Sequence, residues 1–210
     1  MILVGQYDSP YVRRVAVSLH QLEVPFERAP LSTFRDIDAM RRVNPTLRIP
    51  ALILDDGTAL TDSNAILDWL DGEVGPERAL IPPGGIRRRR CWQAIGLAAT
   101  ACDKAKDILY EHALRPAAKV HEPVVARYRG QLEAALAGLD AMIGRPWTLG
   151  ERFSQADITA ACMLGFVGAA VPDAAAVGRW PALGRLAAAC EAMPAFQAGA
   201  PGAEERLAGT

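Results

Sequence analysis

The sequence lacks the charge excess and the long apolar runs that mark two large classes of partner. Its net charge is −1 over 210 residues, so no overall field favours nucleic acid or anionic lipid. No apolar run approaches the roughly 18 residues that span a bilayer. The chain opens directly on Ile2–Val4, without a basic segment or cleavage site. We therefore expect a cytoplasmic protein that binds neither nucleic acid nor membrane.

Cysteine and histidine are also scarce, and their spacing excludes several chemistries. The four cysteines all lie from residue 91 onward, without CxxC or metal-ligand spacing: Cys91, Cys102, Cys162 and Cys190. We interpret them as small buried hydrophobic residues in a reducing compartment. The three histidines share no ligand spacing and have no serine and aspartate companions. The sequence thus predicts neither a metal site nor a catalytic triad.

What the sequence contains is a chain of two parts that differ in their apolar patterns. The first part has the order β-α-β-α-β-β-α, that of the thioredoxin fold. Its expected strands cover 2–4, 25–31, 51–54 and 58–60, and its expected helices cover 10–23, 34–43 and 63–73. Residues 75–85 hold three prolines and three glycines, a linker composition. We place an α/β thioredoxin-like domain at 1–76 before this linker.

The second part has helical spacing throughout, which predicts an all-α domain over residues 86–210. The expected helices cover 87–111, 123–143, 158–171 and 181–193. The Ser154–Asp157 run has the form of a capping box, so the apolar helix after it should be central and buried. The alanine- and glycine-rich tail from residue 198 should be frayed.

One stretch of the first part organises the expected site. Pro50 opens the apolar run 51–54 and cannot donate to a sheet ladder, so the backbone of Ile49 is free to pair with a ligand. The run Thr-Asp-Ser-Asn at 61–64 begins a helix, whose free N–H groups and dipole favour a carboxylate. This combination predicts a site for an extended peptide that carries a carboxylate.

Several short motifs resemble those of the glutathione S-transferases. They are Ser-Pro-Tyr-Val-Arg-Arg-Val at 9–15, Asn-Pro at 44–45, Arg-Ile-Pro at 48–50 and Asp-Ser-Asn-Ala-Ile at 62–66. The capping box and Met-Pro-Ala-Phe at 193–196 extend the likeness to the second part. It is closest to members with an active-site serine, such as the plant tau and phi classes and many bacterial relatives. The resemblance implies a homodimeric enzyme that activates the glutathione thiolate for transfer to a small hydrophobic electrophile.

The resemblance implies a role for Ser9 as the hydroxyl that stabilises the thiolate, with Tyr7 as the alternative. A hydrogen bond and the dipole of the first helix would both lower the pKa of a thiol placed there. From spacing alone, Ser9 is more simply the N-cap of that helix. No cysteine precedes Cys91, so mixed-disulfide chemistry is not expected.

The remaining site residues follow from the same resemblance. Those expected to bind glutathione are Arg48, Ile49, Pro50, Asp62 and Ser63, with the bond before Pro50 in the cis form. Arg48 would reach the glycine carboxylate or be a solvated cation, Asp62 would accept from the α-ammonium group, and Ser63 would donate to the γ-glutamyl carboxylate. Those expected to bind the electrophile are Tyr11, Trp92 and Tyr110, which would line a pocket between the domains.

Two alternatives stay open. A glutathione-dependent isomerase, peroxidase or dehalogenase would share the site but not the outcome, and a non-catalytic glutathione-binding or regulatory module would share the fold. The joint presence of Ser9, Pro50, Asp62 and Ser63 argues against the second. For Arg13 and Arg14 a solvated helix face is favoured over a place in the site. The arginines at 87–90 are interpreted likewise, with a subunit interface as the alternative.

Overall fold

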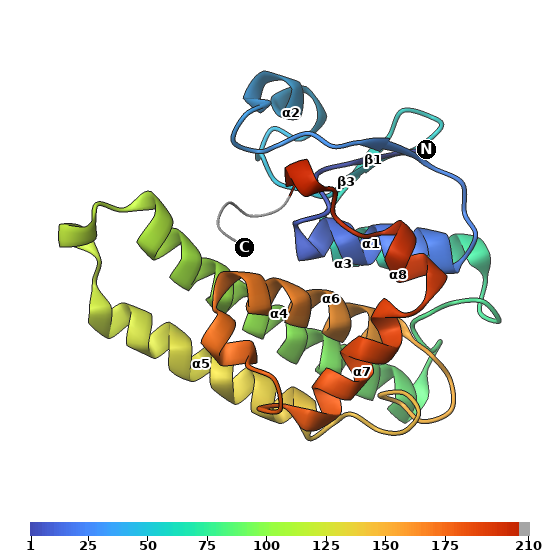
Figure 1. Ribbon diagram of the computed structural model, residues 1–210. Helices are drawn as coiled ribbons and strands as arrows, with labels where there is room; N and C mark the ends of the chain where they lie inside the picture. The colour runs from blue at the N-terminus through green and yellow to red at the C-terminus, as the bar shows by residue number, and fades with distance from the viewer. Residues whose placement is uncertain (206–210) are drawn as a thin grey trace. The chain divides into compact units, whose positions relative to one another are not determined.

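The computed structural model describes residues 1–205, which group into two compact units (Figure 1). Among the described residues, unit 1 comprises Met1–Pro83 together with 192–205, and unit 2 comprises Gly84–Glu191. This grouping differs from the expected helical range 86–210 at its C-terminal end. The last segment packs on the first unit, for reasons given below.

Unit 1 is built on a four-stranded sheet of order β2-β1-β3-β4, in which β1 and β2 are parallel and the other pairs antiparallel. The strands are β1 (Ile2–Val4), β2 (Glu27–Ala29), β3 (Ala51–Ile53) and β4 (Ala59–Thr61). The expected succession of strands and helices is confirmed. Strand β2 is shorter than the expected 25–31 because Pro25 and Pro30 cannot donate to the ladder.

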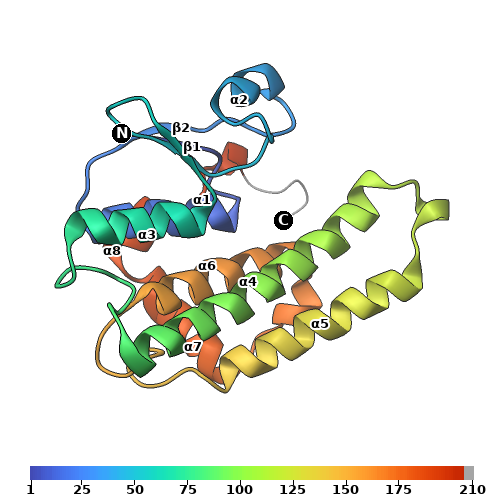
Figure 2. The same cartoon turned by 180° about the vertical axis from the view of Figure 1, so that it is seen from behind.

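Helices cover both faces of this sheet. Helices α1 (Pro10–Gln21) and α3 (Ser63–Val74) lie side by side on one face, and α2 (Ile37–Val43) lies on the other (Figure 1; Figure 2). Met40 of α2 packs against Val4 and Ala51 of the sheet. The result is the three-layer thioredoxin-like arrangement expected from the sequence.

The C-terminal segment returns to unit 1 through α8 (Pro194–Ala198) and the 3-10 turn η3 (Ala203–Glu205), and α8 packs on α1. The Arg13 Nε–H donates to the Gly199 carbonyl at 3.2 Å. A Cβ atom at Gly199 would lie 2.8 Å from the Val17 side chain, so only glycine permits this approach. The expectation of a frayed tail is therefore wrong for residues 198–205; the rest of that tail, 206–210, lies outside the described residues.

Unit 2 is helical. Its helices are α4 (Gly85–Leu114), α5 (Glu122–Asp140), α6 (Gln155–Ala170) and α7 (Pro181–Glu191), with 3-10 turns η1 (Ala117–Lys119) and η2 (Pro172–Ala175). Helix α6 packs against both α4 and α7, which confirms its expected central place (Figure 2). The capping box at its start is present. All four cysteines are buried and free, as expected. Within residues 1–205 no helix has both the length and the apolar character that crossing a bilayer requires.

Candidate functional site

The register of the sheet brings three chain segments to one edge of unit 1. Val4 pairs with Ala51, which in turn pairs with Thr61 on its other side. The end of β1, the start of β3 and the end of β4 therefore lie in a row. Neighbouring strands are about 4.8 Å apart, so the chain leaves these three ends within roughly 10 Å. The loop to Ser9, the segment 48–50 and the start of α3 all emerge there.

The segment before β3 presents a free stretch of backbone. The bond between Ile49 and Pro50 is cis, as the resemblance implied. Among the described residues, neither the N–H nor the C=O of Ile49 has a backbone hydrogen-bond partner. Buried Asn44 shapes the approach to this segment, because its Nδ2 donates to the Arg48 carbonyl at 2.8 Å. The Arg48 side chain is exposed.

Gly5 holds the end of β1 against this segment. Its φ of +130° lies in the region that favours glycine. A Cβ atom there would lie 2.9 Å from the Ile49 Cβ and 2.7 Å from the Val12 Cγ2. The absence of a side chain at position 5 thus lets the loop to Ser9 and the Ile49 segment approach each other closely.

Two residues at the start of α3 form the second component of the site. Exposed Asp62 is the N-cap, and its carboxylate accepts from the Asn64 N–H at 2.8 Å. Its φ of 69° is uncommon for a residue other than glycine, and such conformations concentrate at functional sites. Ser63 follows as the first helical residue, with only 2% of its surface exposed.

Arg14 joins the candidate site, although the sequence favoured a solvated position for it. Its side chain is 1% exposed and crosses from α1 to the start of α3. The Arg14 Nε and Nη2 donate to the Ser63 Oγ at 3.1 and 2.5 Å, and Nη2 also donates to the Asn64 Oδ1 at 2.8 Å. The Ser63 oxygen has two lone pairs, so with both occupied its own O–H is left to donate to a ligand.

The expectation of a solvated face for Arg13 and Arg14 is wrong, since both are buried. Helix α1 is packed by the sheet, by α3 and by α8, and so has little solvent face on which an arginine could lie. A signal was present in the sequence. In projection around the helix Val17 lies between Arg13 and Arg14, so the side that carries the two cations also carries an apolar residue.

Ser9 precedes α1 at the N-cap position, with extended backbone angles and a half-buried side chain. The simplest alternative role was helix capping, yet the Ser9 side chain makes no capping hydrogen bond. Its hydroxyl therefore lies at the positive end of the helix dipole, which favours negative charge.

Tyr7, the rival hydroxyl, lies in a different environment. The residue is 1% exposed, and its hydroxyl has no hydrogen-bond partner among the described residues. The Arg28 guanidinium carbon lies over the ring, 3.5 Å from its centroid. Burial raises the pKa of Tyr7 to about 12 and outweighs the opposing effect of the Arg28 charge. A phenol that is 1% exposed and covered by Arg28 is closed off from a ligand thiol that arrives from solvent.

Alkaline titration checks this burial. The difference between the wild-type and Tyr7→Phe spectra gives the tyrosinate absorbance of Tyr7. We expect this absorbance to develop only near pH 12. An unfolded tyrosine ionises near pH 10, so between these values the unfolded state has lost a proton that the folded state keeps. The contribution of Tyr7 ionisation to the free energy of unfolding therefore decreases as the pH rises from about 10 to about 12. In Tyr7→Phe the free energy of unfolding should decrease less over this pH range. A difference spectrum centred at pH 10 would contradict it.

The three residues expected to bind the electrophile are not brought together within either unit. Tyr11 lies half-buried on α1 in unit 1, where the Arg14 guanidinium carbon is 5.7 Å from its ring centroid. Trp92 and Tyr110 both lie on α4 but are 18 positions apart, about 27 Å along the helix axis. These two cannot line one small pocket side by side.

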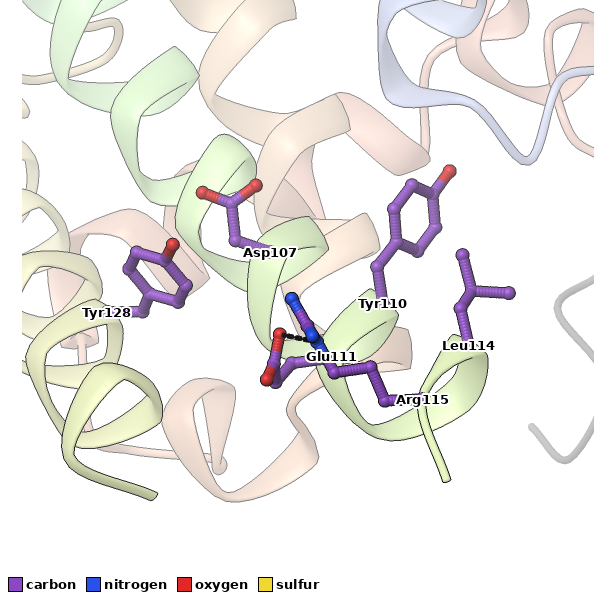
Figure 3. A pocket seen from close by; sticks show the side chains of 6 residues that line it. All are labelled: Asp107, Tyr110, Glu111, Leu114, Arg115 and Tyr128. Atoms are coloured by element: carbon purple, nitrogen blue, oxygen red, sulfur yellow. Dashed lines mark hydrogen bonds and ion pairs between the residues drawn. The ribbon is translucent and has the colours of Figure 1, made fainter. Parts of the chain in front are cut away.

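Unit 2 contains a pocket of about 350 Å³ between α4 and α5, and Tyr110, 39% exposed, is part of its wall (Figure 3). The other lining residues are Asp107, Glu111, Leu114, Arg115 and Tyr128. The Arg115 Nε donates to the Glu111 Oε2 at 2.7 Å inside it. Such a charged lining is more polar than a pocket for a hydrophobic electrophile requires. Among residues 1–205, no three histidine, cysteine or acidic side chains are grouped so as to hold a metal ion.

Comparison with known proteins covers both units. Residues 3–78 match the family model described as "Glutathione S-transferase, N-terminal domain", and residues 122–205 match the one described as "Glutathione S-transferase, C-terminal domain". A glutathione S-transferase of Methylobacterium radiotolerans, solved with glutathione sulfonate, is 30% identical with a TM-score of 0.89 over 96% of this chain and 95% of that one. A glutathione transferase family member of Pseudomonas fluorescens Pf-5 with bound glutathione is 33% identical with a TM-score of 0.81, and the match covers 96% of this chain and 98% of that one. The maleylacetoacetate isomerase of Pseudomonas aeruginosa is 29% identical over 94% of each chain.

Proposed function

Because the chain belongs to the glutathione S-transferase family, we propose that unit 1 binds glutathione and activates its thiol for transfer to a small hydrophobic electrophile. What supports this proposal is the register of the sheet, which aligns the strand ends from which the segments of Ser9, Ile49 and Ser63 emerge. Each of the three offers a different group to an extended peptide: a hydroxyl, a free backbone unit and a helix N-terminus. Glutathione has its cysteinyl unit in the middle and a carboxylate at each end. Its cysteinyl backbone would lie against Ile49, its sulfur would face Ser9, and one carboxylate would face Ser63.

Two contacts would hold the tripeptide. The N–H and C=O of Ile49 would pair with the cysteinyl unit as an additional strand pairs with a sheet edge. The γ-glutamyl carboxylate would accept from the Ser63 hydroxyl and from N–H groups at the start of α3, with the buried Arg14 charge behind them. Asp62 would accept from the α-ammonium group and Arg48 would reach the glycine carboxylate.

Ser9 would place its hydroxyl against the sulfur, as in a serine-type member of the family. The hydroxyl and the start of α1 both favour the thiolate over the thiol, and each unit by which the thiol pKa falls is about 1.4 kcal/mol of that preference. The serine is a hydrogen-bond donor here and does not itself become a nucleophile. The bound thiolate attacks the electrophile, and the product is a thioether or the corresponding adduct.

A glutathione-dependent isomerase is the second candidate, because two relatives that match over nearly their whole length carry the names maleylacetoacetate isomerase and probable maleylacetoacetate isomerase. In that reaction the thiolate adds to a cis double bond and leaves again after rotation. The same site residues would serve both reactions.

The fate of the thiol separates these two functions. We expect the protein to consume one thiol for each molecule of an activated aryl halide, because conjugation keeps the sulfur in the product. With a maleyl compound, isomerisation would instead proceed with no net loss of thiol. Thiol titration alongside product analysis measures both. Absence of S-methylglutathione binding at millimolar concentration in isothermal titration would refute glutathione as the co-substrate.

We also propose a cytoplasmic homodimer that removes reactive electrophiles. Four free, buried cysteines suit a reducing compartment. The proposal of a dimer is based on the family resemblance. Analytical ultracentrifugation at several protein concentrations measures the oligomeric state directly.

A further inference from the structure

Glu205, at the end of the described chain, lies buried beside the loop that leads to Ser9. Only 3% of its surface is exposed. Its Oε1 accepts from the Tyr7 backbone N–H at 3.0 Å and from the Arg28 Nη2 at 2.6 Å, and its Oε2 accepts from the Gly202 N–H at 2.9 Å. A carboxylate can be buried at little cost only when it is paired and hydrogen-bonded, and these three donors meet that condition.

The charge of Glu205 is retained in this setting. Burial acts to raise the pKa of the carboxyl, but the Gly202 N–H, Arg28 and the Tyr7 N–H outweigh it and hold the pKa below the usual value. Hydrogen bonds to an ionised acceptor are about twice as strong as neutral ones. The contact from Tyr7 to Glu205 is therefore a firm link between residues 198 positions apart.

Arg28 completes the arrangement from the side of the sheet. It lies on β2, pairs with Glu205 and covers the Tyr7 ring at 3.5 Å. Residue 5 of the same loop is held by the hydrogen bond from its N–H to the Ala29 carbonyl at 2.9 Å. Ser9 follows Tyr7 by two residues, and its own N–H donates to the Gln6 carbonyl at 3.2 Å. The loop of residues 5–9 is thus held at both its start and its middle.

We propose that Glu205 is a positioning residue for Ser9, so that the C-terminal segment forms part of the thiol-activating apparatus. This inference rests on the proposed function of Ser9. The carboxylate holds the Tyr7 backbone, Tyr7 sets the path of the loop, and the loop sets where the Ser9 hydroxyl meets the sulfur. Glu205 itself contacts neither the thiol nor the site for the tripeptide carboxylates. Its loss should therefore disturb the sulfur and leave peptide binding intact.

The test compares Glu205→Ala and Glu205→Gln with Glu204→Gln, which removes the exposed neighbouring charge. The pKa of bound glutathione is read from thiolate absorbance across pH, and the affinity for S-methylglutathione reports on peptide binding alone. We expect Glu205→Ala to raise the thiol pKa by about one unit, which leaves about tenfold less thiolate near neutral pH. Glu205→Gln should show a smaller rise because its amide oxygen still accepts from the Tyr7 N–H. Glu204→Gln should match the wild type.

The outcomes separate this inference from the proposed function. Unchanged affinity for S-methylglutathione with a raised thiol pKa and a lowered kcat supports the positioning role. Loss of the Glu205 negative charge would by itself lower the thiol pKa, so a rise reports displacement of the Ser9 hydroxyl. A wild-type thiol pKa in both Glu205 variants, or an equal shift in Glu204→Gln, overturns it. If Glu205→Ala does not fold, the nearly isosteric Glu205→Gln decides alone. Failure of the wild type to bind S-methylglutathione would instead refute the proposed function.

Discussion

Replacing Ser9 by alanine should lower the rate of glutathione conjugation by about 10- to 100-fold at neutral pH. A hydrogen bond to a charged group contributes about 1.5–3 kcal/mol, and the bound thiolate would lose that contribution. The side chain makes no capping hydrogen bond in the structure, so the substitution should cost the fold little. Peptide binding uses other groups, and the affinity for S-methylglutathione should stay within about twofold.

Three measurements make this prediction decisive. The rate is measured with saturating glutathione, the thiol pKa by thiolate absorbance, and binding by titration with S-methylglutathione. Ser9→Thr keeps a hydroxyl at the same place and should recover part of the rate. Tyr7→Phe keeps the ring beneath Arg28 and removes only the buried hydroxyl, so it should have little effect. A large loss in Tyr7→Phe with none in Ser9→Ala would reverse the two assignments.

Arg14→Met should weaken the binding of S-methylglutathione by at least about tenfold and lower the melting temperature. The substitution removes the donors to the Ser63 Oγ and the Asn64 Oδ1, and it removes the positive charge next to the start of α3. Ser63 is 2% exposed, so water cannot readily replace the lost donors. A buried polar group left without its partner costs about 1–3 kcal/mol. Arg14→Lys should recover little, because one ammonium group cannot reproduce the planar fork.

Arg13→Met is the matched control, on the same helix and equally a buried cation. Arg13 donates to the Gly199 carbonyl and lies against the Phe196 ring, where the guanidinium carbon is 5.7 Å from the centroid. We expect this control to lower the melting temperature while S-methylglutathione still binds within about twofold of the wild type. Equal losses of affinity in the two variants would mean that general loosening of α1, and not the contact with Ser63, explains the Arg14 effect.

Much of unit 1 could be predicted from short-range patterns. Pro50 marks the start of a strand because it cannot donate to a ladder, and polar residues at 61–64 begin a helix because they satisfy its free N–H groups. The order of strands and helices followed from periodicity, and the resemblance of motifs supplied glutathione. The same local reasoning located Ser9 at the start of α1.

The errors over Arg14 and the tail share a cause, which is that the partner lies far away in the sequence. Arg14 meets Ser63 across 49 positions, and Glu205 meets Tyr7 across 198. The tail from residue 198 is short of large apolar side chains, yet the small size of Gly199 is what lets it pack on α1. The error over Trp92 and Tyr110 has a different cause, because the rise of a single expected helix already separates them by about 27 Å.

The turns, the strands and helices, and the first residues of α1 and α3 follow from local sequence, because they depend on side chains acting on their own backbone. Which groups share the site edge depends on long-range packing. The register of Val4, Ala51 and Thr61 aligns the three strand ends, and burial turns Arg14 and Glu205 from surface charges into supports for Ser63 and Tyr7. A charge acquires such a role through its surroundings, and the surroundings exist only once distant segments have packed together.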